Sequence, residues 1–273
     1  MWKEAAVEAP PKGQLPRVIE LRGITQTYDG GKTFLFNKLN LLLEDKPGQG
    51  QFVVILGVSG CGKSTLLRYI SGLQTPTSGE VLIDGKPKTD SMVISMVFQQ
   101  YSSFPWLSVL DNVMLPLKFR GVPRSDGREQ AMAMIKAVGL EGHEHKYAQS
   151  PILSGGQLQR VAIARSLISN PQIILMDEPF GALDTLTRFR MQTMLYDIWE
   201  KLESTIVFVT HDIQEAVFLG DDIYVMKSGR GTSEIARTIH VDLPLHRDRA
   251  TKREAHFVQL VAEVEDTITS LNA

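Results

Sequence analysis

Residues 51–70 read QFVVILGVSGCGKSTLLRYI and contain three patterns in a row. Residues 51–56 form a continuous apolar run rich in β-branched residues, which is typical of a parallel strand covered on both faces. Residues 57–64 match G-x-x-x-x-G-K-[ST] at every position, and Thr65 follows. The apolar residues that follow have helical spacing. A strand, a glycine-rich loop and a helix in this order predict a phosphate-binding loop, and therefore a nucleotide site.

Each residue type in this loop suits phosphate binding. Glycines allow the backbone to curl until its N–H groups point at phosphate oxygens, and the positive end of the following helix lies at the same place. Lys63 supplies a mobile charge for the β- and γ-phosphates, and the Ser64 hydroxyl is placed to bind Mg2+. Thiol pKa values fall at helix N-termini, so Cys61 has a redox interpretation. Because the chain has no second cysteine, we favour a small residue whose backbone binds phosphate.

A second apolar run ends in two acids. Residues 172–176 read QIILM, and Asp177 and Glu178 follow. Taken alone, a surface acid pair would be the commoner explanation, but the complete phosphate loop reverses that preference. Neighbouring side chains diverge in an extended chain, so the two carboxylates can have different tasks. We predict that Asp177 holds Mg2+ and that Glu178 polarises the attacking water as general base.

The remaining patterns predict an α/β fold with a helical insertion. Further strands are expected at residues 17–22, 34–43 and 205–209. Five apolar residues recur at helical spacing between the last two apolar runs: Met191, Met194, Leu195, Ile198 and Leu202. Strands that alternate with helices indicate a parallel sheet, with ligands at the carboxyl ends of its strands. Residues from about 100 to 165 lack such strand runs, and we expect an inserted helical subdomain there.

Composition excludes several classes of protein. The 29 Lys and Arg nearly balance the 31 Asp and Glu, so the chain lacks the basic excess of a nucleic-acid-binding protein. One cysteine excludes an internal disulfide and a Cys-rich metal site. No uncharged apolar run reaches the roughly 20 residues that cross a bilayer, so we expect contact with a membrane only through a partner. We expect a flexible extension at residues 1–16 and a partly helical tail at 241–273, whose function the sequence does not indicate.

Residues 153–157 read LSGGQ and narrow the function further. Ser-Gly-Gly before an apolar and basic stretch predicts a helix N-cap with exposed N–H groups, which is a second anion site. A phosphate loop with an acidic strand end also describes kinases, GTPases, helicases and recombinases. With this pentapeptide, however, the chain resembles the ABC ATPase family over about residues 18–241. The resemblance implies a P-loop NTPase fold with a parallel-sheet core, an antiparallel β subdomain and an inserted helical subdomain, and we assign residues 17–240 to it.

The resemblance also implies how the site works. In this family two subunits form a head-to-tail dimer, and each ATP lies between one phosphate loop and the partner's signature. Tyr28, in ITQTYDG, matches the aromatic residue that stacks on adenine. Gln99, in MVFQQ, matches the glutamine that approaches Mg2+ and water and senses the membrane partner, and we prefer it to Gln100. Asp184, in GALD, matches the aspartate that links the two sites. His211, in FVTHD, matches the histidine that contacts the γ-phosphate.

Together these assignments predict a complete site for ATP and Mg2+. Its catalytic residues are Glu178, His211, Gln99 and Lys63, and its metal ligands are Ser64, Gln99 and Asp177. The residues that bind the nucleotide are Tyr28, Gly57, Ser59, Gly60, Cys61, Gly62, Lys63, Ser64, Thr65, Ser154, Gly155, Gly156, Gln157 and Asp184.

Three segments, residues 102–113, 176–188 and 209–226, resemble the nitrate, sulfonate and taurine importer branch. This implies separate permease subunits, a second ATP-binding subunit that is identical or related, and a periplasmic or extracellular solute-binding protein that acts indirectly. It implies a peripheral position on the cytoplasmic face of the inner (plasma) membrane. The cluster Phe104-Pro105-Trp106 suits a groove that receives a permease helix, although loop packing alone also explains it.

Three alternatives remain. ATPase subunits of exporters look like those of importers, so export is possible. An ABC ATPase of DNA repair or chromosome structure should carry long heptad arms, and none appears in this sequence. A translation-factor-like ABC protein normally has two nucleotide units in one chain, and this chain has one.

Overall fold

The computed structural model describes residues 17–44, 50–89, 94–202, 204–229 and 232–272. The predicted extension at residues 1–16 lies outside these residues. The strands are β1 (Arg17–Gln26), β2 (Phe36–Glu44), β3 (Phe52–Gly57), β4 (Ser78–Ile83), β5 (Lys86–Pro87), β6 (Ile94–Val97), β7 (Ile173–Asp177), β8 (Thr205–Thr210), β9 (Asp222–Ser228) and β10 (Ser233–His240). The helices are α1 (Lys63–Ser71), α2 (Val109–Phe119), α3 (Arg124–Ala137), α4 (Gly155–Leu167), α5 (Thr185–Trp199), α6 (Ile213–Leu219), the short 3-10 helix η1 (Thr251–Arg253) and α7 (Ala255–Asn272).

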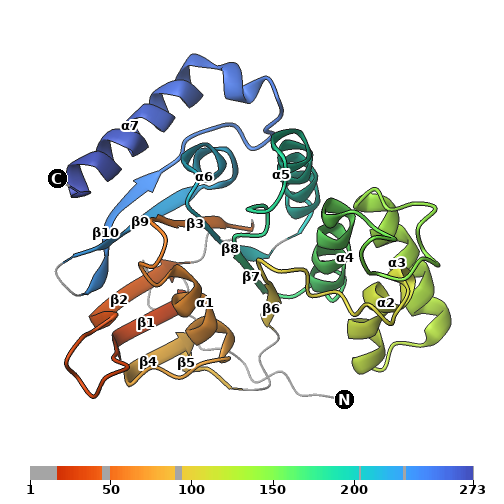
Figure 1. Cartoon of the computed structure of the whole chain (residues 1–273), viewed down its shortest axis with the longest axis horizontal. Coiled ribbons are helices and arrows are strands. Elements are labelled where there is room, and N and C mark those ends of the chain that lie inside the picture. Colours follow the sequence, from red (N-terminus) through yellow and green to blue (C-terminus); the bar gives the residue numbers. More distant parts are fainter. Residues whose placement is uncertain (1–16, 45–49, 90–93, 203, 230–231, 273) are drawn as a thin grey trace, which may run out of the picture.

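The ten strands form one sheet in the order β5-β4-β1-β2-β10-β9-β3-β8-β7-β6 (Figure 1). From β9 to β6 all neighbours run parallel, and at the other end β5, β4, β1 and β2 are antiparallel. The two parts meet through β10, which pairs antiparallel with β9 and forms one parallel pair with β2, Ser233 with Phe36. The predicted phosphate loop follows β3, which lies in the parallel part of the sheet.

The parallel strands are buried because helices cover both of their faces. Every residue of β3, β7 and β8 is buried. Alternate residues of β3 enter two different apolar clusters, as the period of two along a strand requires. Val53 and Ile55 pack with residues of α1, whereas Val54 and Leu56 pack with residues of α5, α6 and α7. Strands with this pattern were predicted at residues 51–56, 172–176 and 205–209, each within one residue of the observed limits.

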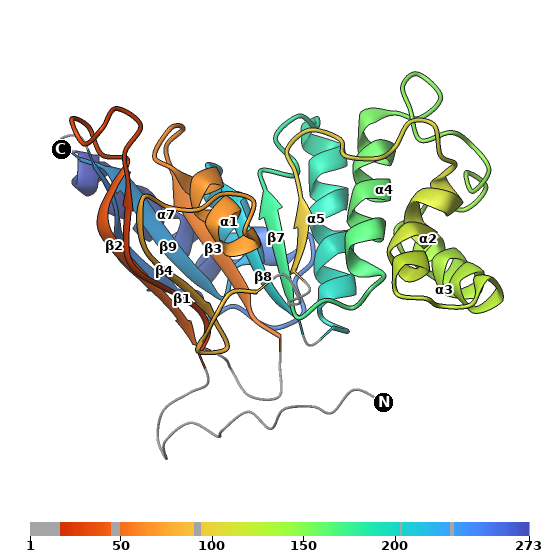
Figure 2. The same cartoon turned by 90° about the horizontal axis from the view of Figure 1, so that it is seen from below.

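The helices α2, α3 and α4 pack together through a third apolar cluster, which includes Val113, Ile135 and Val161. Figure 2 shows α2 and α3 beyond α4, at the end of the molecule away from β1 and β2. Residues 100–165 are all described and contain α2, α3 and most of α4 without a named strand. The limits of an ATPase domain at 17–240 and of a helical subdomain at about 100–165 stay predictions.

The C-terminal segment returns across the sheet. α7 packs against α6, and its residues Phe257, Leu260 and Val264 join the apolar cluster that also holds Val54 and Phe218. Figure 1 shows α7 running beside β9 and β10, back towards the side of the molecule that carries β2. Over the described part of the chain, no helix combines the length and the apolarity needed to cross a membrane.

Candidate active site

The glycine-rich loop joins β3 to α1 and needs glycine at its tightest points. Gly60 and Gly62 have φ values of 85° and 94°, in the left-handed region that glycine favours. A Cβ atom at Gly62 would also lie only 2.5 Å from the ring of Phe36. Gly62 caps α1 without a side-chain hydrogen bond, whereas α2, α4, α5 and α6 are each capped by a Ser or Asp side chain. The first N–H groups of α1 are therefore left for an anion.

Lys63 holds a buried positive charge at the base of this loop. Its side chain is 4% exposed, and its Nζ donates hydrogen bonds to the carbonyl oxygens of Gly57 at 2.8 Å and Val58 at 3.1 Å. The same nitrogen lies 3.6 Å from Oε1 of Glu178. A buried ammonium between loop carbonyls and a carboxylate is well placed to meet a phosphate group that enters the loop.

Ser64 and Asp177 supply two oxygen atoms side by side. The Ser64 hydroxyl donates to Oδ1 of Asp177 at 2.8 Å, although the two residues are far apart in the sequence. Burial raises the pKa of Asp177, and the hydrogen bond from Ser64 lowers it. A partly desolvated carboxylate gains from a nearby cation, and a hydroxyl and a carboxylate are the hard ligands that Mg2+ prefers. The donor set therefore fits the metal that the sequence predicted.

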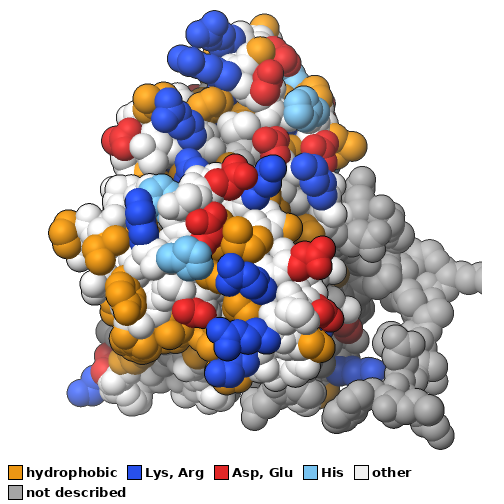
Figure 3. Space-filling model, turned by 90° about the vertical axis from the view of Figure 1, so that its right-hand side faces the viewer, with side chains coloured by type: hydrophobic (Ala, Val, Ile, Leu, Met, Phe, Trp, Pro, Cys, Tyr) orange, Lys and Arg blue, Asp and Glu red, His pale blue; other side chains and the backbone are white. Residues whose placement is uncertain are grey.

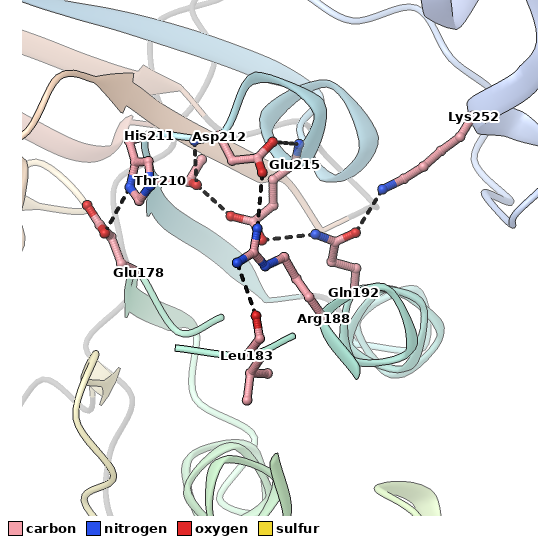
Figure 4. Close-up of polar contacts among 9 residues, drawn as sticks. All are labelled: Glu178, Leu183, Arg188, Gln192, Thr210, His211, Asp212, Glu215 and Lys252. Atoms are coloured by element: carbon pink, nitrogen blue, oxygen red, sulfur yellow. Dashed lines mark hydrogen bonds and ion pairs between the residues drawn. The ribbon is translucent and has the colours of Figure 1, made fainter. Parts of the chain in front are cut away.

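Glu178 has an unusual backbone. β7 ends at Asp177, and Glu178 has a φ of 42°, a left-handed conformation that costs a non-glycine residue about 1 kcal/mol. The expectation of an extended chain at this pair was therefore wrong for Glu178: a sharp turn separates the two carboxylates. The turn directs Glu178 to His211, whose Nδ1 lies 3.0 Å from Oε2 (Figure 4). Strain of this kind is concentrated at functional sites.

Gln99 reaches the same place from the end of β6. A Cβ atom built on Gly181 would lie 3.8 Å from Nε2 of Gln99 and 3.8 Å from Oε2 of Glu178. The two side chains therefore flank one small space beside Gly181. The fold thus gathers six predicted residues at one edge of the sheet: Gln99, Lys63, Ser64, Asp177, Glu178 and His211.

The predicted residues of the LSGGQ segment are not joined to this group. Ser154 and Gln157 form a capping box at the start of α4: Gln157 N donates to the Ser154 hydroxyl, and Ser154 N donates to the Gln157 side chain. Gly155 is pressed against the Tyr101 hydroxyl, and Gly156 lies beside Thr187 of α5. Within the described ranges, no hydrogen bond or ion pair connects these residues to Glu178 or Lys63.

Asp184 and Tyr28 also lie outside the central group. Asp184 caps α5 by accepting from the backbone of Leu186 and Thr187, and hydrogen bonds from Thr187 lower its pKa. Tyr28 lies in the loop between β1 and β2, with 70% of its side chain exposed. Its hydroxyl accepts a hydrogen bond of 3.5 Å from Gln74. The exposed ring can accept a stacked base.

The sequence analysis did not predict the polar network that lies behind His211. Figure 4 shows that Arg188, Gln192, Thr210, Asp212, Glu215 and Lys252 lie together there, on α5, β8, α6 and η1 and, for Asp212, at the N-cap of α6. The signal was present but weak. Gln192 and Glu215 are buried polar residues on helical faces that otherwise carry apolar side chains, and such residues need partners.

The structure leads us to expect an unreactive thiol at Cys61. Its side chain is fully buried, and burial raises the pKa of the thiol, so the nucleophilic thiolate is scarce at neutral pH. We expect a thiol reagent to label the folded chain at least about ten times more slowly than the unfolded chain at pH 8. Absorbance at the release of the reagent's chromophore gives both rates. Equal rates would contradict the burial of Cys61.

Comparison with known proteins points to one family. The model of the family described as ABC transporter matches residues 31–181. The nitrate import ATP-binding protein NrtD of Synechocystis sp. is 40% identical over 260 residues, covering 92% of this chain and 94% of the relative. The aliphatic sulfonates import ATP-binding protein SsuB 1 of Shouchella clausii is 44% identical and covers 93% of both chains. The taurine import ATP-binding protein TauB of Rhizobium johnstonii is 48% identical and covers 83% and 87%.

A solved structure agrees with this family. The dimeric ATP-binding cassette MJ0796, in a post-hydrolysis state bound to ADP and Pi, superposes with a TM-score of 0.69 at 37% identity. The superposition covers 83% of this chain and all of that one. The predicted fold class, an α/β P-loop NTPase with a parallel-sheet core, an antiparallel β subdomain and an inserted helical subdomain, is confirmed, and the two kinds of strand form one mixed sheet.

Proposed function

This chain belongs to the ABC transporter family, and from that membership we propose that it hydrolyses ATP to drive solute import through separate permease subunits. The resemblance that the LSGGQ segment indicated is confirmed. The observation that carries the proposal is the meeting of Lys63, Ser64, Asp177, Glu178 and His211 at the carboxyl ends of the parallel strands. Three relatives named as import ATP-binding proteins support the direction of transport.

The residues of this group have complementary tasks in hydrolysis. The loop N–H groups and Lys63 hold the phosphates and oppose the charge that develops on them. Ser64 and Asp177 would hold Mg2+, which neutralises phosphate charge when it is bound. Glu178 accepts a proton from the attacking water, and its contact with His211 at 3.0 Å keeps the carboxylate aimed. Gln99 and Glu178 both face the space beside Gly181, where Gln99 can orient the same water.

The LSGGQ segment acts on a second nucleotide. Ser154 is exposed at the start of α4, and its hydroxyl accepts from Gln157 N, so the capping box occupies the third N–H of the helix and not those of Gly155 and Gly156. Among the residues that the structure describes, Ser154 forms no hydrogen bond with the group around Lys63, so its phosphate partner belongs to another protomer. The dimer of MJ0796 with ADP and Pi supports this arrangement. The second protomer is a copy of this chain or a related one.

A permease helix docks beside Trp106. Figure 3 faces the helical end of the molecule and shows hydrophobic side chains exposed among charged ones. The loop before α2 is held firmly: Phe104 N donates to the Asn112 side chain at 2.8 Å, and the Arg165 guanidinium lies 5.0 Å from the Phe104 ring. Trp106 packs against Phe104 with the two rings tilted and their centroids 5.2 Å apart, and it is still 68% exposed. A rigid loop that presents a bare Trp is suited to bind a partner.

Trp106→Ala is therefore expected to weaken permease binding. Loss of a large aromatic anchor costs an interface about 2 kcal/mol or more, which is about a thirty-fold loss of affinity. Co-purification of a polytopic permease with the tagged chain from detergent-solubilised membranes measures the effect. Phe119→Ala is the matched control, because Phe119 is 82% exposed at the end of α2 and has no proposed role. Equal recovery with both variants would place the permease elsewhere.

The same experiment with the unchanged chain tests the function itself. Recovery of a polytopic membrane protein, together with MgATP hydrolysis by the purified chain, supports a transport ATPase at the cytoplasmic face of the membrane. Recovery of DNA or ribosomes in its place would overturn it. The solute is proposed by analogy with the relatives as nitrate, a sulfonate or taurine, delivered by a separate binding protein. In cells that lack the chain, loss of uptake of one of these three compounds would identify the solute and exclude export.

A further inference from the structure

The loop that carries His211 is held from behind by buried hydrogen bonds (Figure 4). The Thr210 hydroxyl accepts from Asp212 N at 3.1 Å and donates to Oε2 of Glu215 at 2.5 Å. Asp212 in turn accepts from Glu215 N at 3.0 Å and so caps α6. Both neighbours of His211 are therefore tied to Glu215, and the position of the imidazole follows from theirs.

Glu215 needs donors on both of its oxygens. Its side chain is 5% exposed, and burial raises its pKa, while hydrogen bonds from Thr210 and Gln192 lower it. Gln192, 2% exposed on α5, donates from Nε2 to Oε1 of Glu215 at 2.9 Å. A carboxylate that accepts at both oxygens holds Thr210 only while its second donor stays in place.

Lys252 determines which way the Gln192 amide faces. Its Nζ donates to Oε1 of Gln192 at 2.9 Å. An ammonium group can only donate, so it selects the amide oxygen and leaves the amide nitrogen facing Glu215. In each hydrogen bond between Lys252 and Thr210, the donor and the acceptor are therefore fixed. If the amide rotated, its oxygen would face the oxygen of Glu215, and the chain of donors would be broken.

The ammonium of Lys252 is itself well placed. It belongs to η1, in the segment between β10 and α7, and its Nζ lies 4.5 Å from the centre of the Phe218 ring and 5.1 Å from that of Phe189. Burial lowers the pKa of Lys252, and the charges of Asp212 and Glu215 raise it. Contacts with two rings and one amide hold this side chain in a single position.

We propose that Lys252 is a positioning residue for ATP hydrolysis: through Gln192 and Glu215 it holds the loop that places His211 against Glu178. The inference deepens the proposed function and rests on it. The proposal also assigns a function to the segment after β10. Through Lys252, this segment affects the rate of ATP hydrolysis at Glu178, on the other side of α6.

Lys252→Met tests the proposal in the full chain. Methionine keeps the length of the side chain and its packing on the two rings, and removes the donor. We expect kcat for MgATP to fall about five-fold, the effect of one lost buried hydrogen bond that orients a catalytic group. The KM should change less than about two-fold, because the phosphate loop is untouched. Lys136→Met, at an exposed lysine of α3, should keep both parameters.

A double-mutant cycle separates positioning from general weakening of the fold. In a His211→Ala background, Lys252→Met should cause no further loss, because the residue through which it acts is gone. Gln192→Leu should lower kcat as much as Lys252→Met does, and the two substitutions together should lower it no further. Thr210→Val tests the chain from its other end and leaves Lys252 in place, which covers the case in which Lys252→Met fails to fold.

The outcomes are distinct. An unchanged kcat in Lys252→Met, or an equal further loss in the His211→Ala background, would overturn the inference while leaving the ATPase function intact. Additive losses of Thr210→Val and His211→Ala would overturn it as well. Absence of MgATP hydrolysis by the unchanged chain would overturn the proposed function itself.

Discussion

Glu178→Gln is expected to lower the steady-state rate of MgATP hydrolysis about 1,000-fold, within the range that general bases contribute. The amide keeps the shape of the side chain and cannot take a proton from water. Its contact with His211 Nδ1, now 3.0 Å from the carboxylate, can persist as a hydrogen bond to the amide oxygen. Nucleotide binding should remain, because Lys63 and Ser64 are unchanged. Phosphate release measures the rate, and fluorescence of a nucleotide analogue measures binding.

Glu141→Gln is the matched control for this variant. Glu141 is an exposed acid that pairs with Lys136 at 3.7 Å on the helical end of the chain, and surface pairs of this kind contribute little to stability. Its rate should equal that of the unchanged chain. If Glu178→Gln hydrolysed ATP at the same rate as Glu141→Gln, the general base would be another group.

Ser154→Arg should lower hydrolysis about 100-fold, the usual cost of removing one donor from charged transition-state oxygens. The long side chain would project from the start of α4 into the space that the partner's phosphate requires. Binding of one nucleotide to a single protomer should be unchanged, because no hydrogen bond in the described part of the chain joins Ser154 to the phosphate loop. In the presence of MgATP, light scattering should show dimers of the Glu178→Gln chain. The chain that carries both Glu178→Gln and Ser154→Arg should show no dimers.

The loss of a helix cap has to be separated from the loss of a shared site. Ser108 caps α2 as Ser154 caps α4, by accepting from the backbone of Asp111 at 3.0 Å. Ser108→Arg should therefore lose a similar stability, about 1 kcal/mol, and keep its rate of hydrolysis. If both variants lost the same activity, the effect of Ser154→Arg would come from the lost helix cap and not from a site shared with a second protomer.

How far the fold was predictable depended on burial. β3, β7 and β8 are covered on both faces, so their sequences are continuous apolar runs that stand out in the chain. β4 and β10 were not predicted. Most of their residues are exposed or half-buried, and they owe their extended form to pairing with β1 and β9. Strands of this kind carry little pattern of their own.

The phosphate loop and the acidic strand end could be recognised locally, because the geometry that binds phosphate needs glycines, a lysine and a hydroxyl at fixed spacing. Only the packed chain decided where the rest of the site lies. The contact of Glu178 with His211 and the chain of hydrogen bonds from Lys252 to Thr210 join segments far apart in the sequence. Contacts between distant segments depend on how strands and helices pack, and short-range spacing carries no record of that packing.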